Sequence, residues 1–449
     1  MIAVVTPEQM RTIDAAAPVP VATLIDRAGA AVARAAVRLM GGAYGRTVVV
    51  IAGPGNNGAD GRVAAARLRE RGVSVTVHAA AECPAELSPC DLVIDAAFGT
   101  GFRGTWQPPA VGGAKVLAVD VPTGLDALTG EAAPTTLRAD ATVTFAAIKP
   151  GHVLGDGPDL VGVLEVADIG LDIGRATISI VDADDVDDWV PARARTAHKW
   201  RDAVRLVAGS PGLTGAAHLA AAAAQRAGAG MVVVSSPGIE ANAPIEAVDH
   251  RVGAFDWADA VLADLHRFHA LVIGPGLGRE QHTMPSVVRT VLESVVPVVV
   301  DGDGLFAMSW NDEGSAAFLR DRRVPTVLTP HDGEYGLLTG ARPGPDRIAA
   351  ARHLAEVTNC VVLLKGATTV IAAPAAPTRL VVNGDQRLAT AGTGDVLAGI
   401  IGALLARGVA AAEAAAAGAW IHAEAGRLTS PVGMVAGDLL AAIPAVLAR

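Results

Sequence analysis

The chain has 449 residues, of which 51% are hydrophobic, 18% charged and 3% aromatic, with 50 glycines and a formal net charge of −10. This length allows two or three domains, and the composition is typical of an Ala- and Val-rich α/β protein. The acidic balance argues against a nucleic acid or a membrane surface as partner, because both attract basic faces.

Short Val- and Ile-rich runs alternate with Ala-rich amphipathic stretches along the first part of the chain. This alternation predicts a parallel sheet with crossover helices. Between the first two strands, residues 59–72 (ADGRVAAARLRERG) predict a helix that closes at Gly72. The expected strands are 47–52, 73–79, 90–96, 115–121 and 141–147.

A stretch between about Gly174 and Lys199 is rich in aspartate, then basic, and has no periodic apolar spacing. Its length and composition favour a linker. A second α/β series follows, so the sequence predicts an α/β protein with two domains of unequal size, 1–177 and 178–449. The expected strands of the second domain are 203–209, 230–236, 269–274, 296–302, 324–330 and 360–366.

Three cysteines, Cys83, Cys90 and Cys360, lack metal-ligand spacing and indicate a reducing compartment without disulfides. The N-terminal residues lack the basic start of a signal peptide. No apolar run reaches the roughly 18 residues that a membrane helix needs without a charge or helix breaker. We therefore expect a cytoplasmic protein.

The strand 47–52 is followed by GPGNNGADG, which contains G-x-G-x-x-G starting at Gly53. This spacing is that of a dinucleotide-binding turn, and Glu82, near the end of the next strand, would be the ribose-binding acid. However, two asparagines fill the turn, and Asp60 would place a like charge beside a pyrophosphate. A structural turn capped by Asn and Asp explains the motif equally well.

Three further strand ends carry polar residues: Asp95, then Asp120 with Thr123, then Lys149. Ligands of open α/β sheets bind beyond the carboxyl ends of the strands. Each acid taken singly is more often a helix cap, but four polar strand ends in one domain indicate a site.

Together, GPGNNGADG, DAAFGTGFRG and DVPTGLDA, with LIDRAG at 24–29, resemble the NAD(P)H-hydrate epimerase family over roughly residues 5–175. The resemblance implies a Rossmann-like three-layer fold, with Asp120 and Lys149 as catalytic residues. It also implies a potassium ion held by Asn57, Asp95 and Thr123. The chain has Ala59 and Thr123 where the family usually has glycine and serine. The residues implied to contact the hydrated nicotinamide nucleotide are Asn56, Asn57, Gly58, Ala59, Asp60, Gly99, Thr100, Gly101, Phe102, Arg103, Gly104, Thr105 and Asp120.

In the second domain, TAGTGDVLAG (390–399) joins a glycine-rich turn to an apolar run that predicts a buried helix. Bare amides at Gly392, Thr393 and Gly394 would attract an anion to the helix start. A capping role would explain Asp395 but not the turn before it. We therefore favour a general base beside an anion hole. No Walker A sequence occurs, which excludes a P-loop NTPase.

GTGD, with GSPGLTGAA, GPGLG, DGDGL, HDGE and KGATT, resembles the ADP-dependent NAD(P)H-hydrate dehydratases of the ribokinase-like superfamily over roughly residues 178–449. Taken alone, KGATT is interpreted as a surface hairpin. The resemblance implies a three-layer α/β/α fold, Asp395 as the catalytic base, and ADP with Mg²⁺ as co-substrate. Where the family has HPGE, this chain has HDGE with Asp332, and Ala391 replaces a glycine. The hydrated nucleotide is assigned to Ala216, Gly278, His331 and Asp395, and ADP to Lys365, Gly366, Ala367, Thr368, Thr369 and Gly394.

The two resemblances imply a bifunctional enzyme that repairs hydrated NADH and NADPH. The first domain would interconvert the R and S epimers at C6, and the second would phosphorylate and eliminate the hydroxyl of the S epimer. Two alternatives stay open at this point: a small-molecule kinase of vitamin precursors or sugars, and a non-catalytic nucleotide sensor. We expect a homo-oligomer in which surface helices such as 410–427 pack, with no nucleic-acid or membrane partner.

Overall fold

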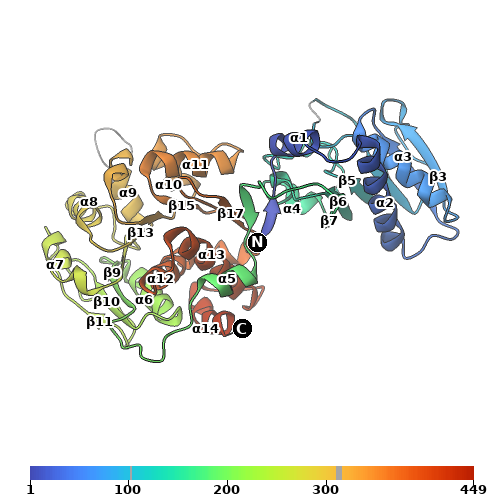
Figure 1. Ribbon diagram of the computed structural model, residues 1–449. Coiled ribbons are helices and arrows are strands. Elements are labelled where there is room, and N and C mark those ends of the chain that lie inside the picture. Colours follow the sequence, from blue (N-terminus) through green and yellow to red (C-terminus); the bar gives the residue numbers. More distant parts are fainter. Residues whose placement is uncertain (102–103, 310–315, 449) are drawn as a thin grey trace. The chain divides into compact units, whose positions relative to one another are not determined.

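The computed structural model describes residues 1–101, 104–309 and 316–448 (Figure 1). The chain divides into two compact units, Ala3–Ile178 and Ser179–Arg449, the latter counted together with Met1–Ile2. Both are α/β units with largely parallel sheets, which confirms the predicted fold class. In the described part of the chain, no helix is both long enough and apolar enough to cross a membrane.

The sheet of the first unit has the order β3-β2-β4-β5-β6-β7, with every neighbouring pair parallel. The strand order reverses next to β2, as in a flavodoxin-like doubly wound sheet, and ligands bind at such a switch point. Sequence analysis missed β7, a half-exposed edge strand without a clear apolar run. The strands are β2 (Thr47–Ala52), β3 (Ser74–Ala79), β4 (Leu92–Ala96), β5 (Lys115–Val119), β6 (Ala141–Phe145) and β7 (Val163–Ala167).

Alternate residues of β2 face opposite sides of this sheet, as the pleat requires. Val48 and Val50 join the core beneath α2 (Val21–Met40) and α3 (Asn56–Arg69), whereas Val49 and Ile51 join a smaller core on the other face. The remaining helices of this unit are α1 (Pro7–Ala15), η1 (Ala80–Glu82), η2 (Pro150–His152) and α4 (Gly157–Leu160).

The sheet of the second unit runs β8-β17-β16-β15-β14-β13-β12-β9-β10-β11. From β15 to β11 all neighbours are parallel, whereas β15, β16 and β17 form an antiparallel series. The division of the chain into two units falls within the short strand β1 (Ile2–Val4), after Ile2. The other strands are β8 (Ile178–Ile180), β9 (Ala203–Val207), β10 (Met231–Ser235), β11 (Val248–Asp249), β12 (Ala270–Ile273), β13 (Val298–Val300), β14 (Thr326–Leu328), β15 (Val361–Leu364), β16 (Thr369–Ala372) and β17 (Thr378–Val381).

At the centre of the second unit lies α12 (Thr393–Ala406), in which every residue except Gly394 and Asp395 is buried. This confirms the predicted buried helix. It packs mainly on α6 (Thr214–Arg226), where a Cβ on Gly399 would lie 2.2 Å from the Ala220 carbonyl oxygen. The other helices are α5 (Ala183–Trp189), α7 (Ala258–Leu262), η3 (Leu265–Arg267), α8 (Met284–Glu293), α9 (Asp303–Ser309), η4 (Ala317–Asp321), α10 (Asp332–Thr339), α11 (Arg347–Thr358), η5 (Gln386–Leu388), α13 (Ala411–Arg427) and α14 (Ala436–Leu447).

Two sequence predictions about this unit are wrong. The expected linker contains β8 and α5, because Asp182 and Asp185 form a capping box that starts a helix. The Ala-rich helix α13, expected at the surface, is mostly buried against α12 and α14. Alanine allows close helix packing, so an Ala-rich face is also suited to a core.

Candidate active sites

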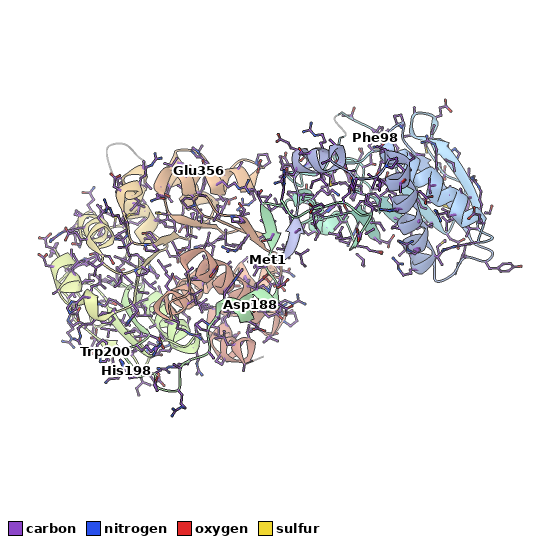
Figure 2. The ribbon with its side chains drawn as sticks, viewed as in Figure 1. Met1, Phe98, Asp188, His198, Trp200 and Glu356 are labelled. Carbon is purple, nitrogen blue, oxygen red and sulfur yellow. The ribbon has the colours of Figure 1, made fainter. Side chains whose placement is uncertain are left out.

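A cavity of about 650 Å³ lies in the first unit, beyond the carboxyl ends of β2, β4, β5 and β6. The loops after these strands supply most of the polar lining of the cavity. Phe98, labelled in Figure 2, also lines it. Helices α1 and α2 also contribute, which sequence analysis did not foresee beyond the LIDRAG motif. Their lining residues are Met10, Asp14, Val21, Leu24, Ile25 and Ala28.

Asp120 lies at the cavity wall with φ 66°, a left-handed conformation that is uncommon outside glycine. Its Oδ1 is 2.8 Å from Lys149 Nζ and accepts a hydrogen bond from Thr144 Oγ1 at 2.9 Å. Burial alone would raise the pKa of Asp120, but the charge and the hydrogen bond of Lys149, with a smaller contribution from the Thr144 hydroxyl, together lower it. Asp120 is therefore ionised. Its other oxygen, Oδ2, lies 3.3 Å from where a Cβ on Gly99 would be.

His152 holds the backbone of Asp120. It was not identified from the sequence. Its Nδ1 accepts the backbone N–H of Lys149 at 3.2 Å, and its Nε2 is 2.8 Å from the Asp120 carbonyl oxygen. The Nε2 atom must therefore carry the proton that it donates to this carbonyl. Burial, then the Lys149 charge, lowers the pKa of His152 to about 4. A neutral imidazole thus holds the left-handed backbone of Asp120 in place.

The other carboxyl groups of the cavity differ from Asp120. Burial, with a smaller contribution from the Asp120 charge, raises the pKa of Asp60 to about 8. A pKa of about 8 leaves Asp60 largely protonated at neutral pH, which reduces the predicted repulsion between Asp60 and a pyrophosphate. Burial also raises the pKa of Asp14, on α1. The cavity combines one carboxylate with two carboxyl groups whose pKa values are raised.

The predicted potassium ligands lie next to this cavity. Asp95 is fully buried, and its carboxylate accepts the backbone N–H of Thr123 at 2.9 Å and the Thr123 hydroxyl at 2.7 Å. Burial raises the pKa of Asp95, and no cationic side chain of the described residues pairs with it. The amide Nδ2 of Asn57 is buried and has no hydrogen-bond partner among the residues that the structure describes, while its Oδ1 lies beside Gly99. The side-chain oxygen atoms of Asn57, Asp95 and Thr123 suit a monovalent cation, whose charge would offset that of the buried Asp95 carboxylate.

The predicted substrate loops meet the cavity only in part. Asn56, Asn57 and Asp60 line it, as do Gly99, Thr100 and Gly101. Gly58, Ala59, Gly104 and Thr105 are not among its lining residues, and Phe102 and Arg103 lie outside the described residues. Glu82, the candidate ribose acid, is exposed in η1 and does not line the cavity either.

Two glycines and one alanine explain the turn after β2. A Cβ on Gly53 would lie 1.8 Å from the Ala97 carbonyl oxygen, and one on Gly58 would lie 2.0 Å from the Gly53 carbonyl oxygen. Both positions therefore exclude any side chain. Ala59 lies in the first turn of α3, its N–H bonded to the Gly55 carbonyl, and has no positive φ. Alanine fits where the related family usually has glycine.

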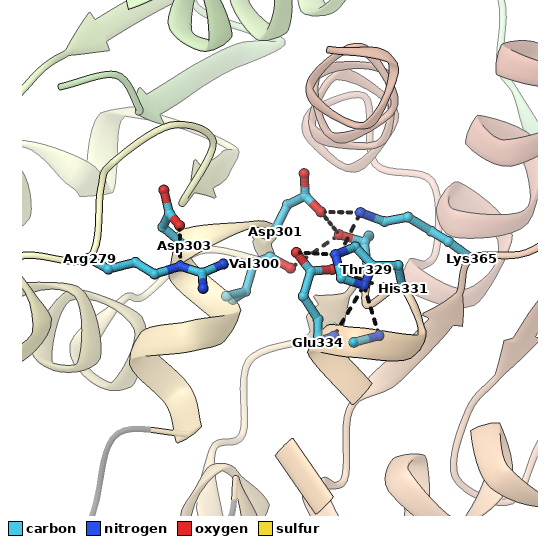
Figure 3. Close-up of polar contacts among 9 residues, drawn as sticks. Arg279, Val300, Asp301, Asp303, Thr329, His331, Glu334 and Lys365 are labelled. Atoms are coloured by element: carbon cyan, nitrogen blue, oxygen red, sulfur yellow. Dashed lines mark hydrogen bonds and ion pairs between the residues drawn. The ribbon is translucent and has the colours of Figure 1, made fainter. Parts of the chain in front are cut away.

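The second unit gathers polar residues at the carboxyl ends of β13, β14 and β15 (Figure 3). Asp301 Oδ1 is 2.6 Å from Lys365 Nζ and accepts the hydroxyl of Thr329 at 2.6 Å. Glu334 Oε2 lies 3.8 Å from the same Nζ. Burial opposes the charge of Lys365, but Asp301 and Glu334 together raise its pKa. KGATT is thus a β15–β16 hairpin, as its isolated pattern predicted, whose lysine side chain enters an acidic cluster.

Asp395 lies next to this cluster, in the first turn of α12. Burial, then the charge of Asp301, raises the pKa of Asp395 to about 7, and Lys365 only partly offsets this. We find no hydrogen-bond partner for its carboxyl group in the part of the chain that the structure describes. A Cβ on Gly394 would lie 3.6 Å from Lys365 Nζ and 3.8 Å from Asp301 Oδ2, so the helix start meets the cluster directly.

The turn before α12 differs from prediction at one amide. Gly392, with φ 90°, provides the N-cap without a side chain. The N–H of Thr393 donates to the Thr390 carbonyl at 3.3 Å, so it is not free as predicted. The N–H groups of Gly392 and Gly394 have no acceptor among the described residues. Two amides are therefore available to an anion at the positive end of the helix.

The remaining predicted residues lie around the same edge. Gly278 donates its N–H to Asp303 Oδ2 at 2.9 Å, and Arg279 Nε binds Oδ1 of the same carboxylate at 3.0 Å. His331 caps α10 by accepting the N–H of Gly333 at 2.9 Å, and its side chain is 58% exposed. Ala216 lies in the first turn of α6. The turn between β15 and β16 contains Gly366, Ala367 and Thr368, and Thr369 is the first residue of β16.

Sequence analysis did not single out the acids that surround Asp395. Asp301 and Asp303 belong to the quoted DGDGL motif, and Glu334 belongs to HDGE. Their position directly after β13 and β14 was the available signal, because polar residues after neighbouring parallel strands meet at one sheet edge. Within the described residues, no three His, Cys, Asp or Glu side chains are placed to hold one metal ion.

Comparison with known proteins matches both units. The NAD(P)H-hydrate dehydratase family model matches residues 204–445, and the model of the YjeF-related protein N-terminus matches residues 21–86 and 78–151. The bifunctional NAD(P)H-hydrate repair enzyme of Moorella thermoacetica is 36% identical, with 96% of this chain and 93% of that protein covered. The enzyme of the same name from Mycobacterium leprae is 37% identical over 92% of this chain and 91% of its own length.

A solved structure matches the second unit. It is an ADP/ATP-dependent NAD(P)H-hydrate dehydratase from Bacillus subtilis, co-crystallised with ATP and Mg²⁺, which is 28% identical. Its TM-score is 0.51, and the match covers 60% of this chain and 98% of that one.

Proposed function

The chain belongs to the family of bifunctional NAD(P)H-hydrate repair enzymes, and we propose that it returns both epimers of hydrated NADH and NADPH to the intact dinucleotides. Residues 1–177 act as the epimerase and residues 178–449 as the ADP-dependent dehydratase. The observation that carries this proposal is the pair of carboxyl groups, Asp120 and Asp395, each at the edge of its own parallel sheet.

In the first unit, Asp120 acts as the base. C6 of the hydrated ring carries the hydroxyl and is bonded to the ring nitrogen. When Asp120 Oδ2 takes the hydroxyl proton, the C6–N bond can break to give an aldehyde, with its electron pair passing to the ring nitrogen. The nitrogen then attacks the other face of the aldehyde, and Asp120 returns the proton to the alkoxide oxygen formed at C6. Lys149 keeps Asp120 ionised between cycles, and His152 fixes its backbone.

In the second unit, Asp395 takes the proton of the C6 hydroxyl, whose oxygen then attacks the terminal phosphorus of ADP. AMP leaves, and elimination of the phosphate from C6 together with a proton from C5 restores the ring double bond. The free amides of Gly392 and Gly394 donate to the transferring phosphoryl group, and the Lys365 ammonium offsets its charge. A base with a pKa of about 7 is well matched to neutral pH.

Two ions complete the proposal. Asn57, Asp95 and Thr123 would hold a potassium ion that compensates the buried Asp95 carboxylate. Because no carboxylate cluster of the described residues suits a metal, Mg²⁺ would be bound chiefly by the phosphates of ADP, neutralising part of their charge. We also propose a cytoplasmic homo-oligomer, whose interface must lie elsewhere than on the buried helix α13.

The test is recovery of the near-ultraviolet absorbance of the dihydronicotinamide ring from an epimer mixture of hydrated NADH. Enzyme, Mg²⁺ and ADP are supplied, with ATP and no nucleotide in parallel. Complete, ADP-dependent recovery supports both activities. Recovery of the S fraction alone would remove the epimerase from the proposal. A stable phosphorylated product of another small molecule, without recovery of absorbance, would favour a small-molecule kinase instead.

A further inference from the structure

Arg347 occupies an unfavourable position for a cation. It is the first residue of α11, where the helix dipole presents positive potential. The side chain is nevertheless only 18% exposed, and its guanidinium is committed to two acceptors. Nη1 donates to Asp332 Oδ1 at 2.8 Å, and Nη2 donates to the carbonyl oxygen of Lys365 at 2.7 Å. One planar group therefore joins the start of α10 to the turn after β15.

The backbone of Lys365 is held on both sides. Its N–H donates to the Pro330 carbonyl at 2.8 Å, and its C=O accepts from Arg347. Its Nζ is fixed in turn by Asp301. The guanidinium also packs against the next residue, because a Cβ on Gly366 would lie 2.8 Å from Arg347 Nη2. The position and the peptide orientation of the Lys365–Gly366 turn thus depend on Arg347.

We infer that Arg347, anchored by Asp332, is a positioning residue that holds the Lys365–Gly366 turn in the geometry that binds the nucleoside diphosphate. This inference rests on the proposed assignment of ADP to that turn. Asp332 stands where the related family commonly has proline, so this chain has a charged anchor at that position. The guanidinium presents two donors in a rigid fork, which a lysine ammonium does not reproduce.

The experiment measures KM for ADP and kcat separately in Arg347→Lys and Arg347→Gln. We expect KM for ADP to rise about tenfold in both, the loss expected for a charge-assisted hydrogen bond, with kcat changed less than about twofold. The KM for the hydrated dinucleotide should change less than the KM for ADP, because Arg347 holds the carbonyl oxygen of Lys365 in the turn assigned to ADP, whereas it meets Asp332 only through that residue's side chain. Asp332→Asn keeps an acceptor oxygen, so its KM should lie between those of the parent and Arg347→Gln.

A matched control is Arg289→Lys, which alters an exposed arginine on α8 paired with Asp259 and Glu293. It should leave both KM values unchanged. Adding Asp332→Ala to Arg347→Gln should cause little further rise in the KM for ADP, because the two side chains act as one unit. An unchanged KM for ADP in Arg347→Gln, even with a lowered melting temperature, would reduce Arg347 to a purely structural role and overturn the inference.

Direct titration of each protein with ADP and Mg²⁺, without the hydrated substrate, separates this inference from the proposed function. If the parent protein binds ADP but restores no dinucleotide, the proposed function fails while the positioning role is still judged by the ADP affinity of Arg347→Gln. If Arg347→Gln binds ADP as tightly as the parent, the positioning role fails whatever the activity. A larger change in the KM for the hydrated dinucleotide than for ADP would also contradict it.

Discussion

Each of the two units has a partly buried carboxyl group beside a lysine, but the pKa of that carboxyl group shifts in opposite directions. In the first unit, Lys149 contacts Asp120 directly and lowers its pKa. In the second, Lys365 is engaged by Asp301, so burial and neighbouring acids raise the pKa of Asp395 to about 7. The lesson is that the direct partner of the lysine, rather than its presence in the site, sets the protonation state of the acid.

The largest effect should follow from Asp395→Asn. An amide cannot accept the hydroxyl proton, so we expect the dehydratase rate to fall by about 10²–10⁴-fold. The epimerase rate should not change, because the carboxyl group that we assign to it is Asp120. Rate measurements on purified epimers, with Asp120→Asn as the reciprocal control, check this. A loss of both activities in either variant would contradict the assignment of one base to each unit.

Lys149→Met should have the next largest effect. It leaves the Asp120 carboxylate buried without its cation, which costs about 3–5 kcal/mol when one partner of a buried pair is removed. We expect a less stable first unit, a raised pKa for Asp120 and weak epimerase activity that recovers at higher pH. Chemical denaturation and a pH–rate profile measure these changes. Wild-type stability and an unshifted profile would show that Lys149 does not control Asp120.

The pH dependence of the two rates should show a smaller difference between the two proposed bases. With a pKa of about 7, the ionised fraction of Asp395 rises about tenfold between pH ~6 and pH ~8, and the dehydratase rate should follow it. The epimerase rate should be flat there, since the pKa of Asp120 is lowered. Rates of both steps across this range test the difference. A dehydratase rate independent of pH would argue against Asp395 as the base.

The stability of the folded chain should depend on pH in the opposite direction to the dehydratase rate, because of Asp395. Between its ordinary value of 3.8 and about 7, this carboxyl group is protonated in the folded chain and ionised in the unfolded chain. The free energy of unfolding therefore falls as pH rises through this window. Asp395→Asn removes that loss, so its melting temperature should exceed the parent's by about 2–4 °C at pH ~8 and match it at pH ~4. A parent as stable as the variant at the higher pH would contradict the raised pKa.

The smallest effect should come from Ala59→Gly, which restores the residue usual in the related family. Ala59 has helical geometry in α3, and glycine within a helix costs roughly 0.5–1 kcal/mol relative to alanine. We expect slightly lower stability of the first unit and an unchanged epimerase rate. Thermal unfolding and the epimerisation assay measure both. A gain of activity would show that the alanine limits the substrate loop.

Sequence reasoning was most effective where strands end. The strands β2 and β9 were predicted from short apolar runs, and Asp120, Lys149, Lys365 and Asp395 were singled out from their surroundings. Asp120, Lys149 and Lys365 come after the strands β5, β6 and β15, so a buried strand and the polar residue after it lie close in the chain. Asp395 instead lies in the first turn of the buried helix α12. Local patterns therefore identify candidate residues, one element at a time.

The partners of those residues could not be predicted in the same way. His152 bonds to the Asp120 carbonyl across 32 positions, and Lys365 pairs with Asp301 across 64. These contacts depend on the register of the sheet and on helix packing, which a local pattern does not encode. The aspartates at 182–188 led to the wrong prediction of a linker for a related reason. Their charge density indicated a loop, whereas Asp182 caps a short helix that begins next to it.

The burial of α12 against α6 has a consequence for how the second unit folds. The two helices begin at Thr214 and Thr393, so the partner of α6 is synthesised only after most of the unit. Until then the part of α6 that α12 covers, including Ala220 and Ala223 beside Gly399, is exposed. Pairing of such distant segments is slow and leaves apolar surface exposed. The nascent chain therefore depends on its late segments, and Asp395, the base that we propose, takes its place only once α12 has packed on α6.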